Sequence, residues 1–219
     1  MSRKQKRNEE KLTKTERKRK EKFDKIVNNM TGKGYEYKEL SLPMWHVYLF
    51  GTIITCAFCT AFFVPFYLIN RPIRFDAEII LLTAIIGLML SVVHELIHGI
   101  TWAMYAKNGL KSIGFGFNLK SFSPYCTCSE PLKKSAYIVG GLMPTLILGL
   151  IPCAIALVIG NELLLFVGML MIIGGAGDII VVLKLIWHRI SDKEIIYLDH
   201  PYKIGLVYFE RAYKSSVES

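Results

Sequence analysis

The sequence predicts an α-helical integral membrane protein with four transmembrane helices and a short β-like loop, cytoplasmic or interfacial, after the second helix. Three observations support this fold class. The 219-residue chain is 52 % hydrophobic and yet has a net charge of +9, which suits a membrane protein that keeps its charges in loops and tails. Four apolar runs reach the length of about 20 residues that a helix needs to cross a bilayer. Of the 27 Lys and Arg residues, 14 precede residue 46.

We expect the transmembrane helices at residues 46–69, 77–105, 136–160 and 163–187. Together these runs define a four-helix transmembrane domain at 46–187. A basic N-terminal arm at 1–45 precedes it, and a mixed polar tail at 188–219 follows it. The first 28 residues are rich in Lys, Glu and Arg, so we expect an exposed helix or a disordered arm there.

The distribution of basic residues predicts the orientation of the spans. Lys and Arg number 14 before the first span, two between the first and second, five from Lys107 to Lys134, none between the third and fourth, and six from Lys184 onward. Because cytoplasmic loops carry the excess of basic residues, this pattern predicts a multi-pass protein of the cell membrane with both termini in the cytoplasm. Acidic residues interleave with the basic ones in the arm, which favours the lipid bilayer over nucleic acid as its partner.

The second predicted span contains three ionisable side chains within five residues, in the sequence HELIH. His94 and His98 share one face of a helix because they are four residues apart, so both imidazoles can face one metal ion. Glu95 lies about 100° around the helix and can act on a water molecule as general base. Ionisable groups at membrane depth cost about 2.5–3.5 kcal/mol each on insertion scales, so three together indicate a site.

A third ligand is needed, and Asp178 is the best candidate. His94 lies 17 residues from the outer end of the second span and Asp178 lies 15 residues from the outer end of the fourth. At 1.5 Å per residue these depths are about 25 and 22 Å. Glu162 and Glu194 are rival ligands, but Glu162 is expected on the opposite side of the membrane and Glu194 beyond the last span. Two imidazoles and one carboxylate predict Zn²⁺ as the cofactor.

Other features of the sequence have simpler readings. In the segment SIGFGFNLKSFSPYCTC, apolar residues occupy alternate positions (Ile113, Phe115, Phe117 and Leu119), which predicts a strand. The segment IIYLDHPYKIGLVYF in the tail is also strand-like. Cys126 and Cys128 form a CxC pair, which we interpret as free thiols rather than a zinc site. Asp199 and His200 are a possible second metal pair, although Asp-His-Pro is more typical of a structural turn.

Several of these motifs together resemble a known family. They are HELIHG in a membrane helix, a strand-like loop, the stretch from Gly140 and Gly141 to Pro144, and GGAGD in a later helix. They resemble the putative zincin peptidase family of bacterial membrane proteins over about residues 82–208. That family is similar in layout to the site-2 intramembrane metalloproteases, whose metal is held by the two His of HExxH and a distant Asp.

The resemblance implies His94, His98 and Asp178 as zinc ligands and Glu95 as the catalytic base. Site-2 proteases usually carry an Asn and a Pro shortly before the ligand Asp. Residues 171–177 of this chain contain neither.

We therefore expect a zinc metalloendopeptidase of the HExxH type, embedded in the membrane by a metalloprotease-like domain. Its expected substrates are membrane proteins or signal peptides, cut near the cytoplasmic face. The alternative is a non-catalytic metal-binding membrane protein that acts as a sensor, a chaperone or a degenerate protease.

Overall fold

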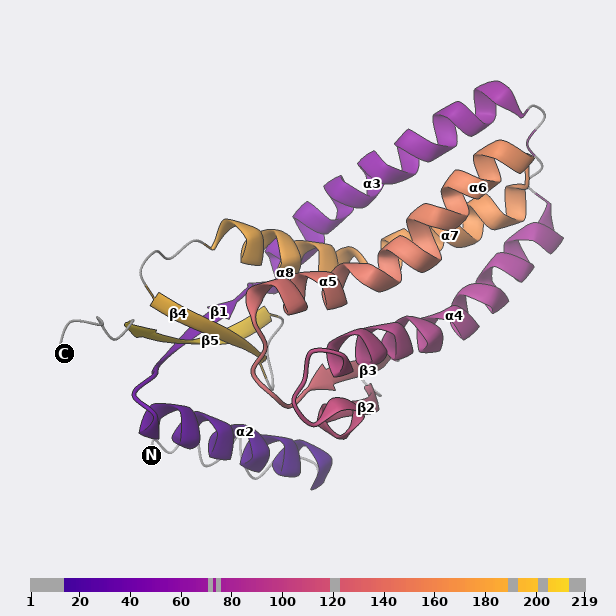
Figure 1. The fold of residues 1–219 in the computed structure, drawn as a ribbon. Coiled ribbons are helices and arrows are strands. Elements are labelled where there is room, and N and C mark those ends of the chain that lie inside the picture. Colours follow the sequence, from indigo (N-terminus) through magenta and orange to yellow (C-terminus); the bar gives the residue numbers. More distant parts are fainter. Residues whose placement is uncertain are drawn as a thin grey trace.

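The computed structural model describes residues 14–70, 73, 76–118, 123–188, 193–200 and 205–212. It consists mostly of helices, with two small antiparallel sheets. Long apolar helices form a bundle at one end of the molecule, while a three-stranded sheet and helix α2 lie at the other end (Figure 1). Both ends of the described chain lie at the sheet end.

Three helical segments are long and apolar enough to cross a membrane: α3 (Met44–Ile69), α4 (Ala77–Ala103) and the run Lys134–Ile159. The third is made of α5 (Lys134–Pro144), the π-helical segment η2 (Thr145–Leu150) and α6 (Ile151–Ile159). A further pair, α7 (Glu162–Gly174) and α8 (Ala176–Trp187), passes the same test when taken together. The expected count of four spans therefore holds if this pair crosses as one unit.

The fourth span differs from the single straight helix expected at 163–187. Helices α7 and α8 are bent by 52° relative to each other. The break falls at Gly175, whose ψ of 5° lies outside the helical range. Glycine is the poorest helix former after proline, and Gly174 and Gly175 stand in succession here, so the chain bends at this point with little resistance.

The tight connection between α6 and α7 has clear local causes. Gly160 adopts the left-handed conformation with φ of 68°, which ends α6. Asn161 follows as the N-cap of α7, and its side-chain oxygen accepts a hydrogen bond from the Leu164 N–H at 2.8 Å. Asp76 caps α4 in the same way through the Ile79 N–H at 3.0 Å.

The predicted N-terminal arm and C-terminal tail share one sheet. Its strand order is β1 (Glu36–Ser41), β5 (Gly205–Ala212) and β4 (Lys193–Asp199), all antiparallel. The strand-like tail is thus confirmed, while β1 was not foreseen. Residues 1–13 of the arm lie outside the described residues, but α2 (Lys14–Gly32) is a helix, one of the two forms expected for the arm.

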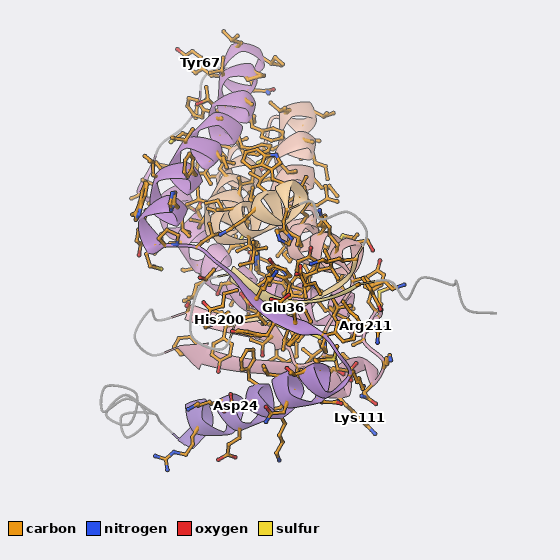
Figure 2. All side chains as sticks on the ribbon, turned by 90° about the vertical axis from the view of Figure 1, so that its left-hand side faces the viewer. Asp24, Glu36, Tyr67, Lys111, His200 and Arg211 are labelled. Carbon is orange, nitrogen blue, oxygen red and sulfur yellow. The ribbon has the colours of Figure 1, made fainter. Side chains whose placement is uncertain are left out.

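The three-stranded sheet is covered on both faces. On one face, side chains of α2 including Phe23 and Met30 pack against Val207 and Phe209 of β5. On the other face, Leu206 and its neighbours pack against the ends of the span-length helices. The alternation of side chains along β5 explains why adjacent residues enter different cores. Figure 2 shows Asp24, Glu36 and Arg211 at this end of the molecule, far from Tyr67 at the tip of α3.

The strand predicted after the second span is confirmed as a hairpin. Strand β2 (Ile113–Asn118) pairs antiparallel with β3 (Ser123–Cys128), after the short 3₁₀ helix η1 (Gly109–Ser112). Leu119 lies outside the described residues. Both strands contact α4, so the hairpin lies beside the helix that carries HELIH.

Glu210 is a buried carboxylate within the three-stranded sheet, with a relative exposure of 2 %. Lys193 donates to its Oε1 atom at 2.7 Å and Lys38 donates to the same atom at 2.5 Å. These hydrogen bonds lower the pKa of Glu210 from 4.5 to about 2. The carboxylate therefore joins the two edge strands through β5 as long as it is ionised.

We expect the contribution of Glu210 to stability to depend on pH in a defined direction. Because its pKa is lowered by folding, the stabilisation is fully present above pH 4.5 and is lost as the pH falls towards about 2. The difference in melting temperature between wild type and Glu210→Gln, followed by circular dichroism in detergent, should shrink across this window. Glu36→Gln, at an exposed carboxylate of β1, should show a smaller difference. A Glu210→Gln difference that does not change between neutral pH and pH 2 would contradict this assignment.

Candidate metal centre

The structure brings together three of the predicted site residues. His94 and His98 lie one turn apart on α4, and Asp178 lies in the first turn of α8. The Nε2 atom of His94 is 3.1 Å from Oδ2 of Asp178, and Nε2 of His98 is 3.4 Å from the same oxygen. The two Nε2 atoms are 3.1 Å apart. Within the described part of the chain, this is the one group of three His, Cys, Asp or Glu side chains with converging ligand atoms.

The dimensions of this triangle suit zinc. Bonds of about 2.0–2.1 Å in a tetrahedral zinc site place neighbouring ligand atoms about 3.3 Å apart. The three observed separations of 3.1, 3.1 and 3.4 Å lie close to that value. The donor set of two imidazoles and one carboxylate also matches catalytic zinc sites, which keep their fourth position open. The residues present therefore fit the ion that the sequence predicts.

The burial of the group is asymmetric. His94 and His98 are 6 % and 3 % exposed, whereas the Asp178 side chain is 36 % exposed. The carboxylate is therefore the least buried of the three ligand groups.

A main-chain carbonyl fixes the orientation of His98. The Nδ1 atom of His98 is 2.7 Å from the carbonyl oxygen of Gly140 on α5. A carbonyl only accepts, so Nδ1 carries the proton and the Nε2 lone pair faces the space between the three side chains. This second contact is of the kind that orients metal-bound histidines in proteins.

Trp102 packs on the other side of His98. The two rings are stacked with centroids 4.9 Å apart and planes inclined by 14°. Gly140 makes this packing possible, because a Cβ atom at that position would lie 2.0 Å from Nε1 of Trp102. Gly140 thus has two roles: its carbonyl orients His98, and its missing side chain admits the indole.

Glu95 lies on the side of α4 that faces the hairpin. Its carboxylate faces the main-chain N–H of Cys126 in β3. The hairpin approaches α4 closely, since a Cβ atom at Gly99 would lie 2.4 Å from the ring of Phe115. The predicted base therefore lies between the two predicted histidine ligands in sequence and next to an extended strand in space.

Asp199 links the three-stranded sheet to the surroundings of the site. Its Oδ2 accepts a hydrogen bond from the Cys128 N–H at 2.8 Å, and its Oδ1 accepts one from the Tyr137 hydroxyl on α5. The imidazole of the adjacent residue, His200, faces Glu39 instead, with 3.8 Å between Nε2 and Oε1. The structural reading of Asp199 and His200 is therefore the correct one.

The two thiols of the CxC pair are free. Burial, with the carboxylates of Asp199 and Glu95 nearby, raises the pKa of Cys126 well above its usual value. Burial also raises the pKa of Cys128 to about 11. Both shifts favour the protonated thiol, which agrees with the interpretation of this pair as free thiols.

The two rival carboxylates lie elsewhere. Glu162 begins α7, beside the connection to α6. Glu194 lies in β4, where Oε2 is 2.7 Å from a guanidinium nitrogen of Arg211. Neither joins His94 and His98.

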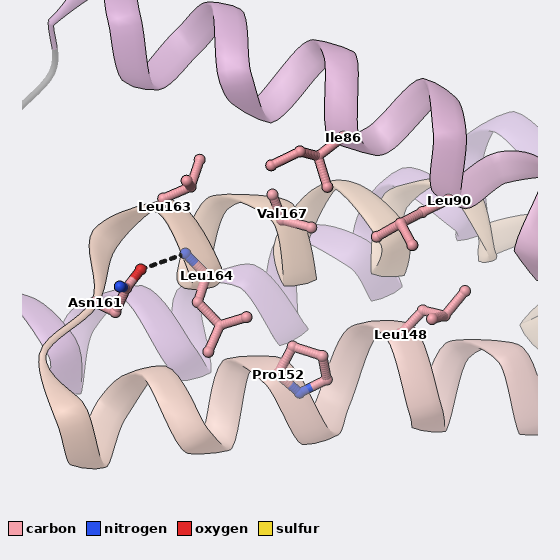
Figure 3. A pocket seen from close by; sticks show the side chains of 8 residues that line it. All are labelled: Ile86, Leu90, Leu148, Pro152, Asn161, Leu163, Leu164 and Val167. Carbon is pink, nitrogen blue, oxygen red and sulfur yellow. Dashed lines mark hydrogen bonds between the residues drawn. The ribbon is translucent and has the colours of Figure 1, made fainter.

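An apolar cavity of about 370 Å³ lies further along α4 (Figure 3). It is bounded by side chains of α4, η2, α6 and α7, among them Leu90, Leu148 and Val167. Asn161 supplies the polar part of the lining, and its side-chain oxygen is used in capping α7. The cavity therefore lacks the converging polar groups that chemistry needs, and the candidate site is the triangle of His94, His98 and Asp178.

Comparison with known proteins agrees with this geometry. Residues 87–191 match the model of a family described as putative zincin peptidase. This part of the chain is therefore similar to that family. The matched segment contains the three residues of the triangle and Glu95, and it also contains the hairpin and α5. No curated protein and no solved structure matched the chain.

Reasoning from sequence alone missed the groups that surround the three ligands. Trp102 lies four residues after His98, so its position on the same helix face could have been predicted from the spacing. The glycine pair at 140 and 141 was recognised in the sequence. The contact of the Gly140 carbonyl could not be predicted, because every residue has a main-chain carbonyl. The contacts of Tyr137 and Asp199 join residues that are 62 positions apart.

Substitution of Gly140 tests the packing around His98. A Cβ at this position collides with Trp102, so Gly140→Ala should displace the indole or the α5 carbonyl and weaken zinc binding. Overpacking of this kind typically destabilises by about 1–3 kcal/mol. Zinc content by elemental analysis and thermal unfolding in detergent measure the two effects.

Gly177→Ala provides the matched control. A Cβ at Gly177 meets nothing within 4 Å, although Gly177 precedes Asp178 directly. This variant should retain its zinc and its stability. Equal behaviour of the two alanine variants would show that close packing at Gly140 is unimportant.

Proposed function

We propose that the protein is a zinc-dependent, membrane-embedded endopeptidase that hydrolyses bonds of membrane proteins or signal peptides near the cytoplasmic face. One observation carries this proposal: two imidazoles and a carboxylate from separate span-length helices converge on a single point. The adjacent glutamate of HELIH and the family match at 87–191 support it.

The residues around the triangle would divide the chemistry between them. His94, His98 and Asp178 would hold the ion. Bound zinc would supply a Lewis acid that polarises the scissile carbonyl and lowers the pKa of water towards about 7. The Glu95 carboxylate would take a proton from the attacking water while the water oxygen bonds to the carbonyl carbon. Glu95 would then deliver that proton to the amine nitrogen as the C–N bond breaks.

The hairpin suits a peptide substrate in extended form. Strand β3 lies against α4, with the Cys126 N–H facing the Glu95 carboxylate. An extended peptide can pair through its main chain with an exposed edge of a small sheet of this kind. Such pairing would present a peptide bond beside Glu95. This arrangement favours a peptide over a compact small molecule as the substrate.

The pairing of β1 with β5 supports the proposed orientation. Strand β1 precedes α3 and strand β5 follows α8, yet their main chains are hydrogen-bonded. This pairing favours an arrangement with both ends of the bundle on the same side of a membrane, as an even number of crossings would give. With four crossings, the excess of Lys and Arg in both flanking segments would put that side in the cytoplasm.

A non-catalytic metal-binding protein is the second candidate. It is favoured by the absence of Asn and Pro at residues 171–177, where site-2 proteases usually carry both. A sensor, chaperone or degenerate protease would retain the metal and lack hydrolysis. The two functions therefore differ in whether cleaved peptide is formed.

The first test of the endopeptidase is zinc content. Purified wild-type protein should contain about one zinc ion per chain, as in other sites of this type. Asp178→Ala should lose the ion because one of three ligands is removed. Glu162→Ala, at the opposite end of α7, should keep it. Equal zinc in wild type and Asp178→Ala would rule out the proposed ligand set.

The second test is hydrolysis. Zinc-loaded wild type should cleave members of a library of synthetic signal-peptide segments, with products identified by mass spectrometry, and a chelator should stop the reaction. Glu95→Gln should keep its zinc and lose about 100-fold or more of the rate, since general acid–base catalysis contributes about 10²–10⁴-fold. Undiminished cleavage by Glu95→Gln would remove Glu95 from the mechanism. Zinc binding without any cleavage by wild type would favour the non-catalytic alternative.

A further inference from the structure

Thr145 carries a buried hydroxyl with no hydrogen-bond partner among the described residues. The residue is 4 % exposed and begins the π-helical segment η2, directly after Pro144. Buried side-chain hydroxyls are nearly always hydrogen-bonded, and π-helical segments within α-helices occur frequently at functional sites. This hydroxyl therefore calls for a specific explanation.

Three other threonines in the span-length helices use their hydroxyls within their own helix. Thr55, Thr83 and Thr101 each donate to the carbonyl four residues earlier, at 2.8, 2.7 and 2.7 Å. This back-bonding is the usual arrangement of a threonine inside a helix. Thr145 does not follow it, so its hydroxyl remains available to a group outside its own helix.

His94 also has a ring nitrogen that lacks a hydrogen-bond partner in the described part of the chain. This atom is the buried Nδ1. A histidine that binds a metal through one ring nitrogen normally donates the other N–H to an acceptor. His98 meets this requirement through the Gly140 carbonyl. For His94 the acceptor has to come from another group.

The two unpartnered groups lie around the same glycine. A Cβ atom at Gly175 would stand 2.2 Å from Oγ1 of Thr145 and 3.5 Å from Cε1 of His94, the ring carbon between Nδ1 and Nε2. The bend between α7 and α8 places this glycine here, three residues before Asp178. The lack of a side chain at residue 175 therefore leaves the hydroxyl and the imidazole edge facing a common space.

Building on the metal site proposed above, we propose that Thr145 is a positioning residue for His94. Its hydroxyl oxygen accepts a hydrogen bond from the Nδ1–H of His94, either directly or through one water molecule. With the ion bound, this bond keeps the proton on Nδ1 and leaves the Nε2 lone pair free for the ion that Asp178 and His98 would also hold. The third span then orients both histidines, His98 through the carbonyl of Gly140 and His94 through the hydroxyl of Thr145.

The test compares zinc affinity with the stability of the metal-free protein. Full-length Thr145→Val, Thr145→Ser and Thr55→Val are purified in detergent, and zinc is titrated in competition with a chromophoric chelator. Thr145→Val should bind zinc about 10–100-fold more weakly, the usual effect of removing such a second contact. Thr145→Ser, which keeps the hydroxyl, should bind like wild type. Thr55→Val should also bind like wild type, because it removes a buried threonine hydroxyl away from the site.

Stability of the metal-free protein separates positioning from packing. In the metal-free protein the His94 proton can lie on Nε2, which is 3.1 Å from Oδ2 of Asp178, so that Nδ1 needs no acceptor and the Thr145 hydroxyl has no donor among the described residues. Replacing that hydroxyl by a methyl group then costs little, so metal-free Thr145→Val should melt close to or above the wild-type temperature while it binds zinc more weakly. A purely structural role predicts that stability and affinity fall together. Thr145→Ala is a second variant without the hydroxyl if Thr145→Val does not fold.

The outcomes distinguish this inference from the proposed function. If variants without the hydroxyl bind zinc as tightly as wild type while Asp178→Ala does not, the role of Thr145 is wrong and the metal site stands. If Asp178→Ala also binds zinc like wild type, the metal site is wrong and the role of Thr145 falls with it.

Discussion

The arrangement of the bundle depends on the need of buried imidazoles for polar partners. His94 and His98 lie on a helix whose other residues are almost entirely apolar, and both are removed from water. Such groups are tolerated inside an apolar bundle only when other groups satisfy their hydrogen-bonding or ligand capacity. Asp178 and the Gly140 carbonyl are the groups that do so. Each comes from a different helix, so helices α4, α5 and α8 have to meet at one depth.

Helices α4, α5 and α8 can approach one another closely because glycines lie at their contacts. The indole of Trp102 lies where a side chain at Gly140 would stand, and the Thr145 hydroxyl lies where one at Gly175 would stand. Small residues let helices in a membrane approach closely, which increases their packing and allows main-chain groups to take part in contacts. The break at Gly175 also directs α8 away from the axis of α7. The same residues therefore set both the path of the last span and the surroundings of the site.

Much of this was predictable, for physical reasons that can be named. The spans followed from hydropathy, and the depths of His94 and Asp178 followed from the rise of a helix per residue. The hairpin at 113–128 followed from alternation of apolar side chains. The bend between α7 and α8 was missed because a glycine pair is compatible with helix packing as well as with a break. Strand β1 was missed because its partner β5 lies about 170 residues away, and no local pattern encodes such pairing.

The three-stranded sheet has a further consequence for the proposed site. The Lys184 side chain of α8 donates to the Ser41 carbonyl at the end of β1, at 2.6 Å. Asp199 of β4 holds β3 through Cys128 and α5 through Tyr137. The sheet thus contacts the helix that carries Asp178, the strand that faces Glu95 and the helix that orients His98. A shift of the sheet relative to the bundle would move all three together. The segments before and after the spans therefore help to hold the surroundings of the candidate site in place.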